Sequence, residues 1–297
     1  MTDEQSKAAD AIPGGCPMHG GGDTPAVFTG EQLTYNDYLK VPELLELQIP
    51  KSTPAHHDEM LFIIIHQTYE LWFKLILHEF NKAIDSMNEC KVLRARHFVD
   101  RVVSIMGVLV QQIHVLETME PAEFLQFRDQ LMPASGFQSI QFRELEFTAG
   151  LKDERYLGFF RNRPNMQQQL EARLNAPDLR STYYQMLRTL GHDIPEDTSA
   201  KHLGTDNADE LAIYAVLKTI YENADDHLAL YLLTESLLSL DQQLILWRQH
   251  HVRVVERIIG FKQGTGGSSG VGYLEKTTAK RCFPYLWQVR THIGVEA

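Results

Sequence analysis

The chain has 297 residues, enough for one large domain or two ordinary ones with a sizeable core. Its 28 Lys and Arg residues and 39 Asp and Glu residues give a net charge of −11. This balance argues against nucleic acid as a main partner, because a polyanion binds a basic face. No apolar run approaches the roughly 18–20 residues of a membrane-spanning helix, and the first residues lack the apolar segment of a secretory signal. Cys16, Cys90 and Cys282 form no CxxC pair, which favours reduced thiols in a cytoplasmic protein.

Residues 1–30 are rich in glycine, proline and small polar residues and show no periodicity, so we predict a disordered N-terminal arm. Cys16-Pro17, together with His19, would offer a labile contact to a metal or a haem, but such a pair in a flexible arm usually has no role. Residues 31–297 are interpreted as one domain.

From Leu33 onward, apolar residues recur at i, i+3, i+4 and i+7, and no alternating β-branched run is convincing. The sequence therefore predicts an all-α fold, a bundle with long helices. Pro54, Pro121 and the segment 133–136 fit helix boundaries. The predicted helices span residues 42–48, 56–87, 91–119, 121–131, 137–149, 164–175, 179–190, 207–263 (with a break) and 283–289.

A glycine-rich segment spans residues 264–272. It lacks the GxxxxGK[ST] order of a nucleotide-binding loop and follows a helix instead of a strand. Two interpretations stay open at this point. The segment is a flexible linker, or it is a loop whose backbone amides approach a small ligand closely.

Helical periodicity separates the 13 histidines. His66 falls on the apolar stripe of the helix predicted over 56–87, and His251 falls on the apolar stripe of the helix predicted over 207–263. His250 lies about 100° round the same helix, on a mostly charged face. An imidazole on an apolar stripe suits an axial haem ligand, although core histidines are also common there.

The His56–Glu59 run and Arg128 are further candidates for a polar site. The run from His56 to Glu59 has the residue types of a metal site, but consecutive residues of a helix point in different directions, and the helix dipole favours acidic residues in a first turn. No Glu has a His three residues later, as di-iron bundles need. Arg128 shares a helix face with Phe124 and Leu131, where a guanidinium would either meet an anion or extend its head group into water. Both interpretations of Arg128 stay open.

Four segments, in this order, resemble the tryptophan 2,3-dioxygenase family, with the bacterial enzymes the most similar. They are PAHHDEMLFIIIHQT (54–68), FRD (127–129) with SGFQS (135–139), WRQHH (247–251) and GFKQGTGGSSGVG (260–272). The resemblance extends from about residue 33 to near the C-terminus.

The resemblance implies an all-α bundle that encloses a haem pocket, with one haem b per subunit of a homotetramer. It also implies the reaction: both atoms of O2 are inserted across the indole C2–C3 bond of L-tryptophan, which gives N-formyl-L-kynurenine, the first step of degradation through kynurenine. Two alternatives stay open. The chain would be a sensor that binds haem or tryptophan without turnover, or a dioxygenase for another indoleamine.

The resemblance also implies roles for individual residues. His251 is expected to be the axial ligand of the haem iron, and His66 to hydrogen-bond the indole N–H. Arg128 is expected to hold the substrate carboxylate, with Thr265 at the amino-acid end. The other substrate-binding positions are Tyr35, Tyr38, Phe62, Ile65, Phe124, Ser135 and Gly136.

Some of these positions have more specific expectations. Phe62 resembles the aromatic wall against the indole, and Ser135 and Gly136 resemble residues near bound O2. The segment with Tyr35 and Tyr38 is expected to reach into the pocket of a neighbouring subunit. Phe124 departs from the family, because a tyrosine is expected there, and this puts one hydrogen bond near the carboxylate in doubt.

Overall fold

The structure is a computed structural model that describes residues 32–267 and 269–294. The predicted arm, with Cys16 and His19, lies outside the described residues. Within them there is no β-strand, which confirms the all-α prediction. The chain divides into two compact units, residues 1–47 and 48–297, and the expected single domain over 31–297 stays a prediction.

The first unit contains two short helices, α1 (Tyr35–Leu39) and α2 (Val41–Leu45). The Thr34 hydroxyl caps α1 by accepting a hydrogen bond from the backbone N–H of Asp37 at 3.2 Å. Between the helices, Lys40 has a φ of 54°, in the left-handed region. Neither helix buries a residue within the chain.

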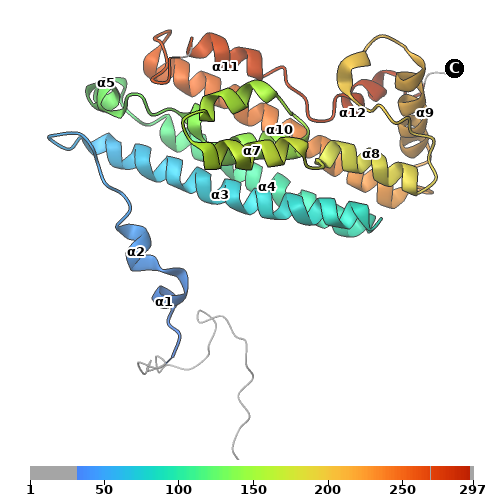
Figure 1. Cartoon of the computed structure of the whole chain (residues 1–297), viewed down its shortest axis with the longest axis horizontal. Helices are drawn as coiled ribbons and strands as arrows, with labels where there is room; N and C mark the ends of the chain where they lie inside the picture. Colours follow the sequence, from blue (N-terminus) through green and yellow to red (C-terminus); the bar gives the residue numbers. More distant parts are fainter. Residues whose placement is uncertain (1–31, 268, 295–297) are drawn as a thin grey trace, which may run out of the picture. The chain divides into compact units, whose positions relative to one another are not determined.

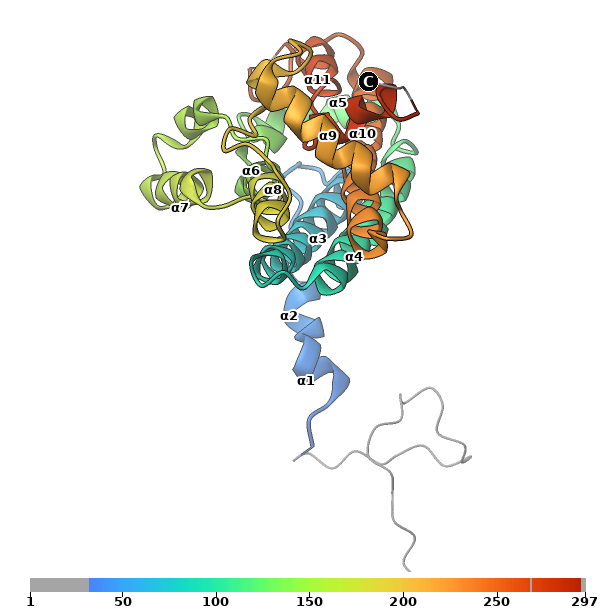
Figure 2. The same ribbon diagram turned by 90° about the vertical axis from the view of Figure 1, so that its right-hand side faces the viewer.

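Three long helices form the centre of the second unit: α3 (His57–Asn88), α4 (Val92–Leu116) and α10 (Leu228–Ile259). α3 and α4 are antiparallel neighbours, because the Tyr69 hydroxyl donates to the Leu109 carbonyl at 2.8 Å while Arg101 pairs with Glu79 at the other end. α10 packs beside α4 (Figures 1 and 2).

The apolar faces of these helices meet in one core that also takes in parts of α5, α8, α9 and α12. The shorter elements are α5 (Pro121–Arg128), η2 (Asp129–Leu131), η3 (Gly136–Gln138), α6 (Ile140–Ala149), η4 (Glu154–Phe160), α7 (Pro164–Asn175), α8 (Leu179–Thr189), η5 (Ala200–His202), α9 (Ala208–Glu222), α11 (Val271–Thr277), α12 (Pro284–Gln288) and η6 (Val289–Thr291).

Asp241 attaches the C-terminal segment to α10. This fully buried carboxylate accepts hydrogen bonds from the backbone N–H groups of Cys282 and Phe283, at 2.9 and 3.0 Å, and from the Trp287 indole at 2.9 Å. Three charge-assisted hydrogen bonds compensate for the buried charge and fix where the chain returns to the bundle.

The predicted helices agree with the structure within a few residues at most ends. The helix predicted over 207–263 is broken between α9 and α10, and the one predicted over 137–149 begins at Ile140 because η3 precedes it. α1, α11 and η4 were not predicted. They are short, and short elements have too few turns to show a period.

By length and composition alone, α3 and α4 are also apolar enough to cross a membrane, with mean hydropathies of 1.3 and 1.4 in their most apolar windows. Core helices of soluble proteins meet the same criterion. Both helices contribute buried residues to the shared core, among them Phe73, Phe80 and Leu109.

Candidate functional site: a cavity between α3, α10 and the glycine-rich loop

The second unit encloses a cavity of about 300 Å³. Its walls come from α3, the end of α4, α5, the segment 135–146, α10 and the glycine-rich loop with α11. His66, Arg128, His251 and Thr265, which lie far apart in the sequence, all line it. A largely apolar cavity with a few convergent polar groups is the usual form of a small-molecule site.

His251 lies on the α10 wall. Its ring stacks on Trp247, one turn earlier, with the ring centroids 5.3 Å apart and the planes 14° apart. Burial, together with the smaller effect of the nearby His66, lowers the pKa of His251 to about 4. The imidazole is therefore neutral at physiological pH, which is the form that binds a metal.

His66 lies on the α3 wall. Its Nδ1 donates a hydrogen bond to the Phe62 carbonyl at 2.7 Å, because a carbonyl oxygen can only accept. The ring keeps an accessible face because it lines the cavity, yet the surrounding protein desolvates it and lowers its pKa. Nε2 is then left without a proton and is free to accept a hydrogen bond from a ligand.

An aromatic cluster adjoins His66. The Phe62 ring lies 4.1 Å from the His66 ring and 5.7 Å from the Phe124 ring, and Phe124 packs edge-on against Phe127 at 5.3 Å. Phe124 lines the cavity and is 8% exposed. The departure from the expected tyrosine therefore falls inside the site, where it replaces a hydroxyl with apolar surface.

Arg128, at the end of α5, is bound by Gln263, the residue directly before the glycine-rich loop. Its guanidinium donates to the backbone carbonyl of Gln263, and the Thr265 hydroxyl donates to the Ala134 carbonyl at 2.7 Å. The loop approaches so closely that a Cβ on Gly266 would lie 2.7 Å from the Ser135 Cβ. The second interpretation of the glycines, close backbone approach at a site, is therefore supported.

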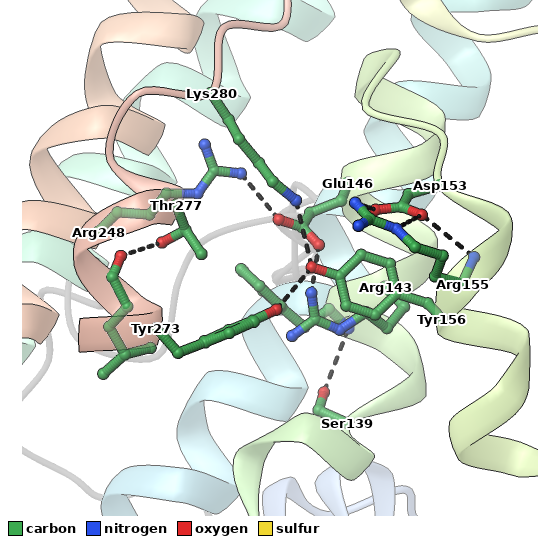
Figure 3. Close-up of polar contacts among 12 residues, drawn as sticks. Ser139, Arg143, Glu146, Asp153, Arg155, Tyr156, Arg248, Tyr273, Thr277 and Lys280 are labelled. Carbon is green, nitrogen blue, oxygen red and sulfur yellow. Dashed lines mark hydrogen bonds and ion pairs between the residues drawn. The ribbon is translucent and has the colours of Figure 1, made fainter. Parts of the chain in front are cut away.

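An ion-pair network that the sequence analysis missed forms another part of the wall (Figure 3). Glu146 on α6 pairs with Arg143, three residues earlier, at 2.5 Å and with Arg248 on α10 at 2.9 Å. All three residues are less than a tenth exposed. Two guanidinium groups share one carboxylate, so the network has one positive charge in excess.

Two tyrosines extend the network. The Tyr156 and Tyr273 hydroxyls lie 2.8 Å apart, and the Arg143 guanidinium lies 4.2 Å from the Tyr156 ring centroid (Figure 3). Lys280 donates to the Tyr156 hydroxyl at 3.2 Å. Since Tyr273 belongs to α11, the network connects that helix to α6 and α10.

The residues present fit a metal cofactor that carries carboxylates, as haem does. His251 offers a neutral imidazole to an iron. Nε of Arg143 and Nη1 of Arg248 are buried and have no hydrogen-bond partner within residues 32–267 and 269–294. Buried N–H donors of this kind need a hydrogen-bond acceptor, and haem propionates would supply one.

Several of the predicted site residues are not among those that line the cavity. Ile65 is 5% exposed in the core and is not among the residues lining the cavity. Tyr35 and Tyr38 belong to the first unit and are 74% and 72% exposed. The His56–Glu59 run forms no metal cluster in the described residues: Glu59 accepts hydrogen bonds from Lys51 and Ser52.

The chain is similar in sequence to proteins of one family over most of its length. The family model described as tryptophan 2,3-dioxygenase matches residues 22–204 and 205–293. A protein of that name from Xanthomonas euvesicatoria pv. vesicatoria is 44% identical over 265 residues, which is 89% of each chain. Another from a Nocardioides species is 46% identical over 269 residues, 89% of this chain and 96% of the relative.

Proposed function

The chain belongs to the tryptophan 2,3-dioxygenase family, and from that membership we propose that the cavity between α3 and α10 is its active site. The protein is an oxidoreductase, a dioxygenase of tryptophan catabolism. It inserts both atoms of O2 across the indole C2–C3 bond of L-tryptophan and gives N-formyl-L-kynurenine. The two oxygen atoms account for the whole change in composition, so the reaction consumes no external reductant.

The family is haem-dependent, and we propose one haem b per subunit, whose iron the imidazole of His251 would bind. The support is the neutral imidazole on the cavity wall and its stacking on Trp247. Arg143 and Arg248 would hold the propionates through their unpaired N–H groups. When bound, the haem iron supplies the redox chemistry that lets O2 react with the electron-rich indole.

The chain's own residues would bind and orient the amino acid. Arg128 has five N–H donors and offers those that Gln263 leaves free to the substrate carboxylate. The Thr265 hydroxyl donates to Ala134, so its oxygen can accept from the substrate ammonium. Holding both charged groups in place fixes where the indole enters the cavity. Binding energy is in this way used to orient the substrate for reaction.

The indole itself would lie against α3. Phe62 offers its ring face, and Nε2 of His66 accepts the indole N–H. We assign His66 a positioning role, since an indole N–H is a very weak acid. Ser135 and Gly136, which line the cavity beside the loop, would adjoin the O2. The apolar lining excludes competing water from the reacting atoms.

The remaining proposals concern assembly and location. We propose a homotetramer in which Tyr35 and Tyr38, on a helix that buries no residue within its own chain, reach the pocket of a neighbouring subunit. A cytoplasmic location is supported by the unpaired thiols of Cys90 and Cys282.

The observation that carries the proposal is the convergence of His66, Arg128, His251 and Thr265 on one cavity. The test is an absorption spectrum of the reduced, oxygen-free protein, before and after L-tryptophan and then air. A haem band that responds to tryptophan, followed by formylkynurenine absorbance, is expected. Haem without product would favour a sensor or another indoleamine, and a protein that takes up no haem would overturn the assignment.

The ligand assignment has a matched pair of variants. His251→Ala should lose the haem or shift its spectrum, whereas His250→Ala, one residue away on the outer side of α10, should keep it. Unchanged ligation in His251→Ala would contradict the role of His251.

A further inference from the structure

A second group of metal-binding side chains lies on the outer side of the bundle, away from the cavity lining. His114 on α4, Glu117 at the end of α4 and His250 on α10 each place one ligand atom within 4.8 Å of the other two. It is the one cluster of three such residues in the part of the chain that the structure describes. The proposed function assigns no role to any of them.

The two helices present these side chains to each other because they run parallel. Ser236 on α10 bonds Asp100 on α4, and fourteen residues further along both helices the ring of His250 meets the ring of His114 edge-on at 5.2 Å. His114 and Glu117 are three residues apart, so they share a face of α4. Metal sites in helix bundles are built from side chains on facing helices, and here α4 offers two such side chains and α10 one.

The distances suit a first-row divalent ion. Bonds of about 2.0–2.2 Å place the ligand atoms of a tetrahedral zinc about 3.4 Å apart. Nδ1 of His114 and a carboxylate oxygen of Glu117 are already 3.2 Å apart. One ligand atom of His250 lies within 4.8 Å of both. His114 is 46% exposed, which leaves room for water as a fourth ligand.

We propose that His114, Glu117 and His250 bind a divalent transition-metal ion of the zinc class. Two imidazoles and one carboxylate are a ligand set that zinc takes in proteins with an open fourth position. In the absence of metal, the imidazole of His250 forms no hydrogen bond within residues 32–267 and 269–294, and its contact is the His114 ring. A metal ion gives it a partner.

The position of the site defines what the ion would do. His250 precedes the proposed iron ligand His251, and His114 follows Ile113, which lines the cavity. The ion would join α4 to α10 outside the cavity lining and hold these two walls together. Because it binds the folded state alone, it raises thermal stability by mass action.

The test is calorimetric titration of the haem-loaded full chain with Zn²⁺. We expect one saturable equivalent that raises Tm. His114→Ala, His250→Ala and the conservative Glu117→Gln should each weaken this equivalent by at least about tenfold, since even partners outside the ligand shell contribute 10–100-fold to metal affinity. His97→Ala, an exposed histidine on the same α4, is the matched control and should bind as the wild type does.

Zinc K-edge absorption of the loaded protein gives an independent readout. Two imidazoles and further oxygen ligands at about 2.0–2.1 Å are expected. A sulfur shell at about 2.3 Å would assign the zinc to a cysteine and overturn the proposal. Equal affinity and stoichiometry in wild type and all three variants would overturn it as well. The haem band reports folding of each variant, and neither readout depends on turnover, so failure here is distinct from failure of the proposed function.

Discussion

Nδ1 of His66 lies 2.7 Å from the carbonyl oxygen of Phe62, one turn earlier on α3. This bond fixes the tautomer, because the carbonyl accepts the only ring proton of a neutral imidazole. Burial lowers the pKa of His66 and keeps it neutral. The backbone of α3 therefore determines that His66 meets a ligand as an acceptor through Nε2.

His66→Ala tests that role. Loss of one neutral hydrogen bond should lower kcat/KM for tryptophan about tenfold, in line with roughly 1–1.5 kcal/mol. 1-Methyltryptophan cannot donate the bond, so the preference of the wild type for tryptophan over it should largely disappear in the variant. Steady-state formation of formylkynurenine and of its methylated analogue measures both. A variant that binds tryptophan normally but has no turnover would instead identify His66 as an obligatory base.

Much of the fold follows from local pattern. In α3, α4 and α10 a 3.6-residue period is repeated over many turns, so the sequence predicts these helices and the inward faces of His66 and His251. The network of Arg143, Glu146 and Arg248 was missed for a different reason. Glu146 and Arg248 are 102 residues apart, and each would be read alone as a solvated charge. Their burial depends on pairing across α6 and α10, which no single helix encodes.

The substrate pocket shows the same limit. The sequence predicted that Arg128 meets either an anion or water, and the structure adds the contact with Gln263 that holds the guanidinium beside the loop. The separation of Ile65 from the cavity depends on the rotation of α3 about its axis. A helical wheel gives that rotation only to within a residue, so Ile65 and His66 fall on the same stripe in the sequence.

Arg128→Ala should weaken tryptophan binding by about 2–5 kcal/mol, because a charge-assisted fork to the carboxylate is lost. Tryptamine lacks the carboxylate and is the discriminating ligand, since its affinity should change little. Spectral titration of the haem band measures both affinities, and an unaltered band without ligand shows that the haem is retained. Normal tryptophan affinity in the variant would remove Arg128 from the binding site.

Phe124→Tyr should restore a hydrogen bond near the carboxylate. Phe124 lines the cavity and packs on Phe62 and Phe127, so the added hydroxyl enters a site that already holds a ring of this size. One net hydrogen bond contributes about 1 kcal/mol, which corresponds to a roughly fivefold lower KM for tryptophan. KM with tryptamine is the control and should not fall. A higher KM for tryptophan would show that the hydroxyl is left unpaired in the cavity.

Gly266→Ala should disturb the loop, because its Cβ would lie 2.7 Å from the Ser135 Cβ and 2.8 Å from the Ser135 hydroxyl oxygen. The loop must move outward and take Thr265 with it. The loss of tryptophan binding, taken as a free energy from KM, should therefore exceed the loss in the free energy of unfolding. Gly107→Ala, on α4 with no atom within 4 Å of the new Cβ, is the matched control: it should leave KM unchanged and should not lower stability, because alanine favours a helix more than glycine does. Adding Ser135→Gly to Gly266→Ala should bring KM part of the way back to the wild-type value. If KM did not change, the effect of Gly266→Ala would not come from its contact with Ser135.

The histidines of the cavity also make the stability of the haem-free protein depend on pH. Burial lowers the pKa of His251 to about 4, whereas the unfolded chain takes up this proton near 6.5. Between these values the unfolded state binds more protons, so stability is full above about pH 6.5 and falls as the pH falls toward 4. The loss from His251 amounts to at most about 3 kcal/mol.

Urea unfolding of the haem-free protein at several pH values measures this loss. In His251→Leu, the free energy of unfolding should depend less on pH. The dependence that remains should come from His66, whose pKa is lowered as well. If His251→Leu kept the wild-type slope, the acid sensitivity would come from groups outside the cavity.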